Sequence, residues 1–437
     1  GSGVAHSPDG ETVFIPGAAP GDEARVRIVK DCKRYAFGIL DEVLTPSPDR
    51  IPVDCAVAGP CGGCSLRHLD YAAELRAKQE NVADAFARIG GLDVPVLPIV
   101  GSPEVNRYRN KVQFPVGVDK SGKPCIGFYA GRTHRIVPCP DCRLQPGVLN
   151  EIGNALCAFF AEKGIQPYSE ETGRGLVRHI FLRRGAHSGQ IMVCLVCTRA
   201  KLPSAEELCT RLKAQFAEIT TILLNVNAKN TNVILGTETH TLYGPGYIED
   251  TLCGVPVQLG PLSFYQVNTL AAEQLYGIAA QYAQLTPDDL LLDLYCGMGT
   301  IGLSMAAHCR ELIGVEIVPE AIESAKANAA RMGADVAAKS RFFCADAGQA
   351  ATRLAAEGLH PDIVMLDPPR KGCDEATLSA VVRMSPRRVV YVSCNPATAA
   401  RDAAWLEQNG YHAEKVQPVD LFPRTRHCEC VLSLSKV

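Results

Sequence analysis

The sequence predicts an α/β protein with a doubly wound parallel sheet in its C-terminal part, and its length, composition and one change of pattern support this. The chain has 437 residues, which exceeds one ordinary hydrophobic core and indicates two or three domains. Hydrophobic residues make up 47% and charged residues 21%, as in globular proteins and unlike disordered or fibrous ones. From about residue 263 onward, apolar runs alternate with helical stretches, as expected for parallel strands buried on both faces.

Turn signals divide residues 1–45 into short segments. Thr12 to Ile15 and Ala24 to Val29 show the alternation of half-buried strands, and Pro-Gly and Pro-Asp-Gly sequences separate these segments. Short strands that are closely spaced by turns predict a small β-barrel in this region.

Residues 46–262 mix helical and strand-like patterns. A cysteine-rich loop precedes a helical pattern with few breakers from Tyr71 to Ile89, and Ala205 to Phe216 is a second helical stretch. Gln190 to Val196 has the composition of a buried strand. We therefore expect an α+β central domain.

Four apolar runs define the C-terminal domain, which we place at residues 263–437. Each run is short and is followed by a helical stretch, so the predicted sheet is mostly parallel. The runs are Leu290 to Leu294, Glu311 to Val315, Asp362 to Leu366 and Arg388 to Val392. No apolar run reaches the roughly 18 residues of a membrane span, and we expect a cytoplasmic protein.

A glycine-rich loop follows the first of these runs. The sequence Asp293-Leu-Tyr-Cys-Gly-Met-Gly-Thr300 allows a sharp turn and a close approach of a ligand to the backbone. Glu316 ends the next run, where a carboxylate can accept both ribose hydroxyls, and Asp346 follows a further strand-like segment. The loop lacks the full G-x-G-x-x-G spacing of an NAD site. The loop and the two acids resemble the Rossmann-like methyltransferases that bind S-adenosylmethionine.

Two further strand ends carry the motifs Asp367-Pro-Pro-Arg370 and Ser393-Cys394-Asn-Pro396. Parallel strands present their carboxyl ends at one edge, where ligands bind, so we expect both motifs to face the cofactor's methyl group. A cysteine thiolate there can add to C6 of a uracil ring and make C5 nucleophilic enough to take a methyl group. The C5 proton must then be removed by a general base, for which Glu429 is the candidate.

In their order along the chain, these motifs resemble those of the RNA uracil-C5 methyltransferases. The motifs are Phe264-Tyr-Gln-Val-Asn268, the loop from Asp293 to Thr300, Asp367-Pro-Pro-Arg370, Ser393-Cys-Asn-Pro396 and His427-Cys-Glu429. The resemblance implies an enzyme in which Cys394 is the nucleophile and Glu429 is the base. The implied S-adenosylmethionine-binding residues are Gln266, Tyr295, Thr300, Glu316, Asp346 and Asp367. The residues implied to hold the target base are Phe264, Gln266 and Asp367.

Nineteen cysteines, an odd number scattered along the chain, favour reduced thiols and one metal site over a disulfide framework. Cys55-x5-Cys61-x2-Cys64 needs a fourth ligand, which Cys139 or Cys142 can supply, and four thiolates can hold either zinc or an iron–sulfur cluster. The sequence from Cys61 to Leu69 resembles the cluster loop of RumA/RlmD-type 23S ribosomal-RNA uracil methyltransferases. This resemblance implies a [4Fe–4S] cluster that is held by Cys55, Cys61, Cys64 and Cys142.

The predicted partner is RNA. Phe14-Ile-Pro-Gly17 and Pro20-Gly-Asp22 look like part of a TRAM domain, an OB-like RNA-binding barrel. The net charge is −3, but residues 101–150 hold eight basic residues against three acidic ones. We expect the stretches Arg107 to Lys111 and Arg174 to Arg184 to contact phosphates. The target uracil must lie in a loop or be flipped out of its stack.

The resemblance favours 23S ribosomal RNA as the substrate, and two alternatives remain. A transfer-RNA uridine C5 methyltransferase shares the catalytic motifs, and a non-catalytic iron–sulfur RNA-binding protein belongs to another class. The latter predicts a damaged catalytic motif, whereas Asp367, Cys394 and Glu429 are all present. We expect a monomer that binds neither DNA nor membranes.

Overall fold

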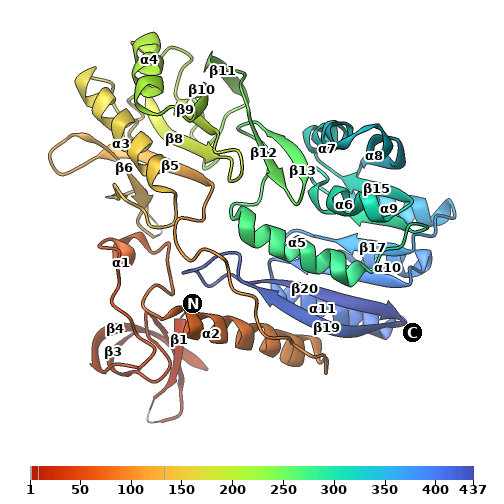
Figure 1. The fold of residues 1–437 in the computed structure, drawn as a ribbon. Coiled ribbons are helices and arrows are strands. Elements are labelled where there is room, and N and C mark those ends of the chain that lie inside the picture. The colour runs from red at the N-terminus through yellow and green to blue at the C-terminus, as the bar shows by residue number, and fades with distance from the viewer. Residues whose placement is uncertain (1, 8, 132) are drawn as a thin grey trace.

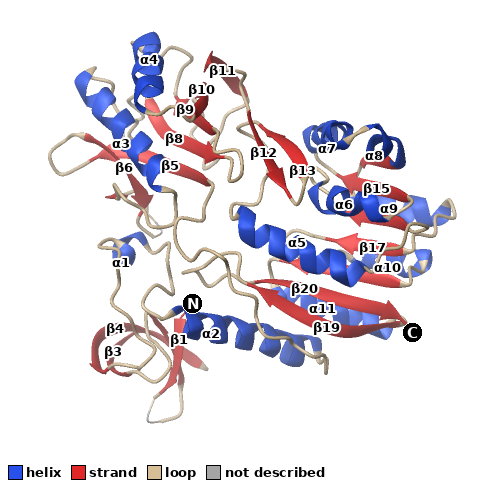
Figure 2. Cartoon of the chain, in the orientation of Figure 1, coloured by secondary structure: helices blue, strands red, loops and turns tan. Residues whose placement is uncertain are grey.

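Two large sheets, one small sheet and a hairpin organise the chain in the computed structural model, which describes residues 2–7, 9–131 and 133–437 (Figure 1). Arg132, one of the basic residues counted above, lies outside the described residues. The small sheet and the first large sheet lie on one side of the molecule, and the C-terminal sheet lies beside both of them (Figure 2).

The N-terminal strands form a four-stranded sheet in the order β1-β2-β4-β3. Their bounds are β1 (Ser2–His6), β2 (Thr12–Pro16), β3 (Glu23–Cys32) and β4 (Tyr35–Thr45). The two predicted strands are thus confirmed, and the edge strands β1 and β3 do not pair with each other in the described residues. The interior is small, with Val13, Ile15 and Ala36 as its buried members.

A long helix follows the cysteine-rich loop, as predicted. After the short helix α1 (Ala58–Cys61), α2 (Tyr71–Asp84) continues into a π-helical turn at Ala85–Gly90. Asp70 caps α2, because its carboxylate accepts a hydrogen bond of 2.6 Å from the amide of Ala73. Val82 and Phe86 bury the end of this helix against the C-terminal domain.

The central sheet has seven strands in the order β11-β10-β9-β8-β5-β6-β7. Its strands are β5 (Lys111–Val118), β6 (Pro124–Tyr129), β7 (Ile136–Pro138), β8 (Val177–Arg184), β9 (Ile191–Cys197), β10 (Ile219–Val226) and β11 (Glu238–Tyr243). The helices α3 (Gly147–Glu162) and α4 (Ala205–Gln215) cover one face through a core that includes Phe114, Leu156 and Phe160. The predicted α+β character of this region is confirmed.

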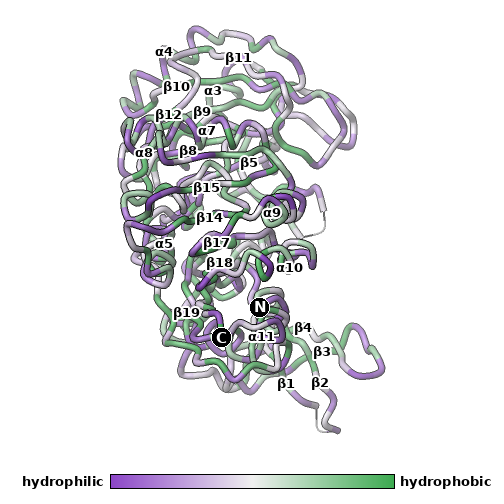
Figure 3. Tube along the Cα trace, turned by 90° about the vertical axis from the view of Figure 1, so that its right-hand side faces the viewer, coloured by the Kyte–Doolittle hydropathy of each residue, from purple (hydrophilic) through white to green (hydrophobic). Residues whose placement is uncertain are grey.

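The C-terminal sheet has seven strands in the order β16-β15-β14-β17-β18-β20-β19. The strands are β14 (Leu290–Leu294), β15 (Glu311–Glu316), β16 (Ser340–Cys344), β17 (Ile363–Leu366), β18 (Arg388–Ser393), β19 (Tyr411–Val419) and β20 (Glu429–Lys436). The pairs from β16 to β18 are parallel, and β20 is antiparallel to both of its neighbours. Figure 3 shows β15, β14, β17 and β18 following one another down the sheet.

Helices cover both faces of this sheet, as expected for a doubly wound fold. The helices are α5 (Thr269–Ala283), α6 (Thr300–Met305), α7 (Pro319–Met332), α8 (Ala334–Lys339), α9 (Ala347–Ala356), α10 (Glu375–Met384) and α11 (Pro396–Gln408). The core under α9, α10 and α11 also contains Val82 and Phe86 from the end of α2.

The core under α5, α6 and α7 extends into the central domain. It includes the hairpin strands β12 (Ile248–Leu252) and β13 (Val255–Leu259), together with Phe181, Met192 and Leu223 of the central sheet. The two large sheets therefore share one apolar core. Among the described residues, no helix is both long and apolar enough to cross a bilayer.

The central core generates a stability prediction. Phe160→Ala removes a fully buried ring, and such truncations cost about 3–5 kcal/mol because the space refills only partly. We expect urea to unfold the central domain at a lower midpoint in circular dichroism. Val233→Ala, at a position that is 64% exposed, is the matched control and should stay within about 0.5 kcal/mol. Equal midpoints for the two variants would contradict the packing described here.

Candidate active site

The glycine-rich loop turns the chain from β14 into α6 at the place where the strand order reverses. Tyr295, Gly297 and Gly299 have φ angles of 66°, 55° and 80°, so the backbone is left-handed at three positions within the loop. A Cβ atom added to Gly297 would have no neighbour within 4 Å, which means that the loop faces open space there. Ligands of open α/β sheets bind at this kind of edge.

Asp293, the last polar residue of β14, is buried beneath the loop. One carboxylate oxygen, Oδ2, accepts a hydrogen bond of 3.0 Å from the amide of Gly302, whereas Oδ1 has no partner among the described residues. Burial, with smaller contributions from Asp367 and Glu316, raises the pKa of Asp293 to about 8. This buried oxygen is free to accept a hydrogen bond from a ligand or a water.

Two more predicted acids end the neighbouring strands. Glu316 ends β15, and its carboxylate oxygens accept hydrogen bonds from the amides of Gly297 at 3.2 Å and Val318 at 3.0 Å. Asp346 follows β16 and caps α9, because it accepts a hydrogen bond of 3.1 Å from the amide of Gln349. The three acids thus lie at the ends of adjacent strands, as the sequence predicted.

Thr300 and Gln266 meet at a tyrosine that the sequence reasoning missed. The buried hydroxyl of Tyr276, on α5, lies 3.4 Å from Oγ1 of Thr300 and is hydrogen-bonded to the side chain of Gln266. Burial raises the pKa of Tyr276, and the negative charge of Asp367 adds to this effect. In the sequence, Tyr276 looks like one more core residue of an apolar helix, so no local signal distinguishes it.

Tyr295 lies on the other side of the loop. Its hydroxyl is 3.4 Å from Oγ1 of Thr377 on α10 and is also hydrogen-bonded to the thiol of Cys373. The Tyr295 side chain also packs against the core under α9, α10 and α11. Its hydroxyl therefore faces α10, while its backbone forms part of the loop.

The two catalytic candidates converge at the edge of the sheet. Cys394 directly follows β18, and Glu429 begins β20, whose next residue Cys430 pairs with Ser393. Asp367 directly follows β17, the neighbour of β18 on the other side. The structure thus brings the predicted thiol and the two predicted carboxyl groups to one place.

Burial raises the pKa of all three groups, and neighbouring charges add to the shifts of Glu429 and Cys394. Burial, followed by the charge of Asp367, raises the pKa of Glu429 to about 8, and burial raises the pKa of Asp367 to about 7. Burial also raises the pKa of the Cys394 thiol, as do Glu429 and Asp367, whereas a hydrogen bond from Arg370 acts in the opposite direction. Strongly perturbed acids beside a cysteine in a strand-end site are typical of catalytic groups.

The loop with Phe264 and Gln266 is held by Arg183 of β8 and by Asn110, which directly precedes β5. Arg183, only 1% exposed, donates hydrogen bonds to the carbonyls of Gly260 at 2.8 Å and Ser263 at 2.7 Å. Asn110 donates to the carbonyl of Gln266 at 2.8 Å. Phe264 itself is 72% exposed, so its aromatic ring is available for stacking.

Three arginines in the basic stretches that were expected to contact phosphates bind protein groups instead. The guanidinium of Arg107 forms a bidentate ion pair with Asp141 and also donates hydrogen bonds to the carbonyls of Cys142 and Gln145. Within the second stretch, Arg183 is buried as described above, and Arg178 pairs with Glu170 at 2.9 Å. These arginines stabilise loops, because carbonyl and carboxylate groups already occupy their donors.

The predicted metal-binding cysteines come from two segments that lie together. After burial, the charges of Cys142 and Cys55 raise the pKa of Cys61, those of Cys142 and Cys61 raise the pKa of Cys64, and Cys139 adjoins Cys142. A hydrogen bond from Cys139, followed by the amides of Leu144 and Gln145, lowers the pKa of Cys142 despite its burial. However, no three Cys, His, Asp or Glu residues within the described ranges have the spacing of a bound metal's ligands.

A buried ion network was also missed. Lys78 of α2 pairs both with Glu74, one turn earlier on the same helix, and with Asp420, which follows β19. In sequence, Glu74 and Lys78 look like an ordinary exposed pair one turn apart on a helix, and their partner lies more than 300 residues away.

Comparisons with known proteins show which family the chain resembles. The family model of tRNA (uracil-5-)-methyltransferases matches residues 188–437, and the TRAM domain model matches residues 1–40. An uncharacterized RNA methyltransferase from Halalkalibacterium halodurans is 43% identical over 99% of this chain and 94% of its own length. Another from Bacillus cereus is 42% identical over 100% of this chain and 94% of its own length.

A solved structure extends the likeness to the whole fold. The crystal structure of Pyrococcus abyssi tRNA (uracil-54, C5)-methyltransferase in complex with S-adenosyl-L-homocysteine superposes with a TM-score of 0.78 and 26% identity. The match covers 99% of this chain and 100% of that one. With a family model that covers more than half of its length, the chain belongs to the tRNA (uracil-5-)-methyltransferase family of RNA-modifying enzymes and carries a TRAM domain at its N-terminus.

Proposed function

We propose that this enzyme transfers a methyl group from S-adenosylmethionine to C5 of a uracil in RNA, with Cys394 as nucleophile and Glu429 as general base. The convergence of Cys394, Glu429 and Asp367 at one sheet edge carries this proposal. The reaction needs a thiol that attacks the ring and a carboxylate that removes a proton, and both are present there.

The glycine-rich loop and the strand-end acids fit S-adenosylmethionine. Glu316 would accept the ribose hydroxyls, Asp346 would lie on the adenine side, and Asp293 has an unpartnered oxygen beneath the loop. Gln266, Tyr295, Thr300 and Asp367 complete the proposed set. The Pyrococcus abyssi relative, whose structure contains S-adenosyl-L-homocysteine, supports this assignment.

The chain's residues divide the reaction into addition and elimination. S-adenosylmethionine, when bound, supplies an electrophilic methyl group. Cys394 attacks C6 as a thiolate, so the C5=C6 electron pair becomes available at C5 for the new carbon–carbon bond. Glu429 then takes the C5 proton, the C–H electrons re-form the double bond, and the C6–S bond breaks with its electron pair returning to sulfur. Arg370 favours the thiolate by its hydrogen bond to Cys394.

The target base would be held by Phe264, Gln266 and Asp367. The exposed ring of Phe264 offers a stacking surface, and Asp367, with its pKa near 7, can donate a hydrogen bond when protonated. A uracil inside a duplex cannot reach this edge, so the target is a loop nucleotide or a flipped one.

We further propose 23S ribosomal RNA as the substrate, with a [4Fe–4S] cluster held by Cys55, Cys61, Cys64 and Cys142. The proximity of these four thiols and the lowered pKa of Cys142 support ligation by thiolates. Transfer RNA is the second candidate, because the full-length structural relative acts on transfer RNA. We assign residues 1–45, 46–262 and 263–437 as the TRAM, central and methyltransferase domains.

The N-terminal sheet supports an RNA substrate independently of the cysteines. Phe14, Tyr35 and Phe37 lie with their ring centroids 5.6 to 5.8 Å apart, and Tyr35 and Phe37 are about two-fifths exposed. Exposed aromatic rings on a small β-domain provide surfaces on which bases stack.

A mechanism-based trap tests the nucleophile. With RNA that contains 5-fluorouridine and with S-adenosylmethionine, the fluorine cannot leave as a proton, so the adduct to Cys394 should survive denaturation. Gel electrophoresis should show this adduct for the native chain and for Cys32→Ala, a matched thiol control in the N-terminal sheet. Cys394→Ala should form none, and an adduct in that variant would disprove the assignment of the nucleophile.

The pKa of Glu429 predicts the pH dependence of proton removal. A base acts only when ionised, and a pKa near 8 leaves Glu429 mostly protonated at pH 6, so the rate should rise with pH and level off above about 8. Tritium release from RNA labelled at uracil C5, in single turnovers between pH 6 and 9, measures this rate. A flat profile over that range would exclude Glu429 as the base.

Iron and sulfide analysis tests the proposed cluster. Anaerobically purified protein should contain about four iron atoms and four sulfides per chain, and Cys64→Ser should lose them whereas Cys125→Ser should not. Zinc in place of iron would contradict the cluster.

Mapping of 5-methyluridine in cells without this protein should show its loss from 23S ribosomal RNA, and loss from transfer RNA alone would decide for the second candidate.

A further inference from the structure

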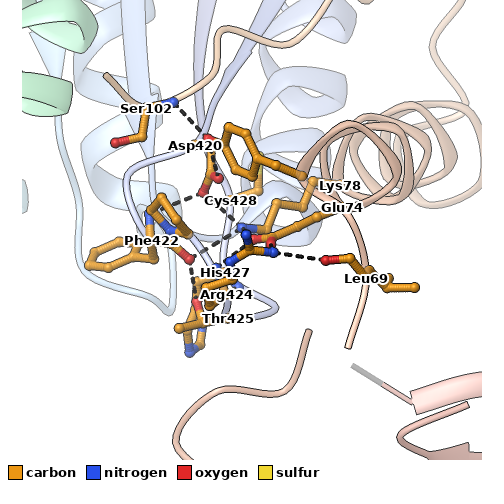
Figure 4. Close-up of polar contacts among 12 residues, drawn as sticks. Leu69, Glu74, Lys78, Ser102, Asp420, Phe422, Arg424, Thr425, His427 and Cys428 are labelled. Atoms are coloured by element: carbon orange, nitrogen blue, oxygen red, sulfur yellow. Dashed lines mark hydrogen bonds and ion pairs between the residues drawn. The ribbon is translucent and has the colours of Figure 1, made fainter. Parts of the chain in front are cut away.

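The buried ion network joins α2 to the segment that leads into Glu429. Glu74, Lys78 and Asp420 are each at most 1% exposed. The ammonium of Lys78 donates to Glu74 Oε1 and Asp420 Oδ1, both at 2.7 Å, and to the carbonyl of Phe422 at 3.2 Å (Figure 4). All three of its protons are thus used, which is the condition under which a buried charge is tolerated.

The second oxygen of Asp420 is also occupied. It accepts a hydrogen bond of 2.9 Å from the hydroxyl of Tyr71, which itself accepts one of 2.8 Å from the amide of Ser102. The amide of Asp420 donates to the carbonyl of Val100 at 2.9 Å. The start of the segment 420–428 is therefore fixed by groups from α2 and from the chain that follows it.

Arg424 fixes the middle of the same segment in an unusual conformation. Its φ angle of 68° is left-handed, which a residue with a side chain rarely adopts. Its amide donates to Glu74 Oε1 at 2.7 Å, and its guanidinium donates to the carbonyl of Leu69 at 2.8 Å. The amide of Leu66 returns a hydrogen bond of 3.1 Å to the carbonyl of Arg424.

The position of Glu429 depends on where this segment ends. In the described residues, no hydrogen bond or ion pair from another side chain fixes the Glu429 carboxylate, which is 7% exposed. The segment 420–428 connects β19 to β20, and Glu429 is the first residue of β20. Cys394, by contrast, follows β18 and has no bond to the network.

We propose that Glu74 and Lys78 are positioning residues for the general base: their buried network fixes the segment 420–428 and thereby sets Glu429 beside Cys394. This inference rests on the proposed function. The network touches neither the thiol nor the glycine-rich loop, so its loss affects the two halves of the reaction unequally. Thiol addition and formation of the C5–methyl bond continue, whereas transfer of the C5 proton to Glu429, with return of the C6–S electron pair to sulfur, slows.

The signature of this role is an accumulating covalent adduct with ordinary uridine in the RNA. Lys78→Met leaves the Glu74 and Asp420 carboxylates without their shared cation, and the segment 420–428 must rearrange. A misplaced catalytic group loses roughly ten- to a hundredfold in rate. We expect tritium release from uracil C5 to fall by that factor while the single-turnover rate of methyl attachment changes by less than about threefold.

The experiment uses the full-length enzyme with RNA and S-adenosylmethionine, and compares five variants by methyl attachment, tritium release and the denaturation-resistant adduct. Lys78→Met and the milder Tyr71→Phe should accumulate adduct, and Lys78→Arg should restore release toward the native rate. Arg76→Ala, two positions from Lys78 on an exposed part of α2, is the matched control and should behave as the native chain. Glu429→Gln is the reference for a missing base.

The outcomes are distinguishable. Adduct in Glu429→Gln, Lys78→Met and Tyr71→Phe supports the positioning role. If Glu429→Gln alone accumulates adduct, the positioning role is overturned and the proposed function stays in place. In that case the rates of methyl attachment and tritium release in the network variants fall together or do not change. No adduct in Glu429→Gln overturns the proposed function itself. If Lys78→Met does not fold, Tyr71→Phe decides by the same measurements.

Discussion

The antiparallel pairing of β20 with β18 is the constraint on which the whole site depends. Parallel strands deliver their last residues to one edge of a sheet, which accounts for Asp367 and Cys394. An antiparallel strand delivers its first residue to that edge, and so the Ser393–Cys430 pair brings Glu429 to the thiol from the far end of the chain. The backbone hydrogen bonds of this antiparallel pair thus bring the proposed nucleophile and base together, and the network around Lys78 fixes the segment that leads into Glu429.

This arrangement places acids in a crowded, desolvated space. Asp293, Asp367 and Glu429 all have pKa values raised to between about 7 and 8, because each is buried and two of them feel the charge of Asp367. Protonation of Asp367 and Glu429 in turn lessens the rise in the pKa of the Cys394 thiol, because after burial their negative charges contribute most to that rise. The proposed addition by the thiolate is therefore assisted when Asp367 and Glu429 are neutral, whereas the proposed proton removal needs Glu429 charged.

Local patterns predicted the strands and their ends, and they failed where a residue's role depends on a distant partner. The apolar runs at 290–294 and 388–392 are strands with nearly those bounds, because a strand that is buried on both faces has a continuous run of hydrophobic residues. Glu74 and Lys78 have no distinguishing sequence pattern, since exposed ion pairs on helices have the same spacing. Arg107 and Arg183 were misjudged for the same reason, because only the fold shows that carbonyls occupy their donors. The spacing of Cys55, Cys61 and Cys64 predicted their proximity, but it could not choose between Cys139 and Cys142.

The apolar core that the central sheet shares with the C-terminal sheet has a mechanical consequence. Phe181 and Met192 of one sheet and Leu291 and Val390 of the other belong to a single close-packed cluster, and such clusters resist shear. Movement of one sheet against the other would therefore break close-packed apolar contacts, which favours an RNA substrate that adapts its own shape to the protein.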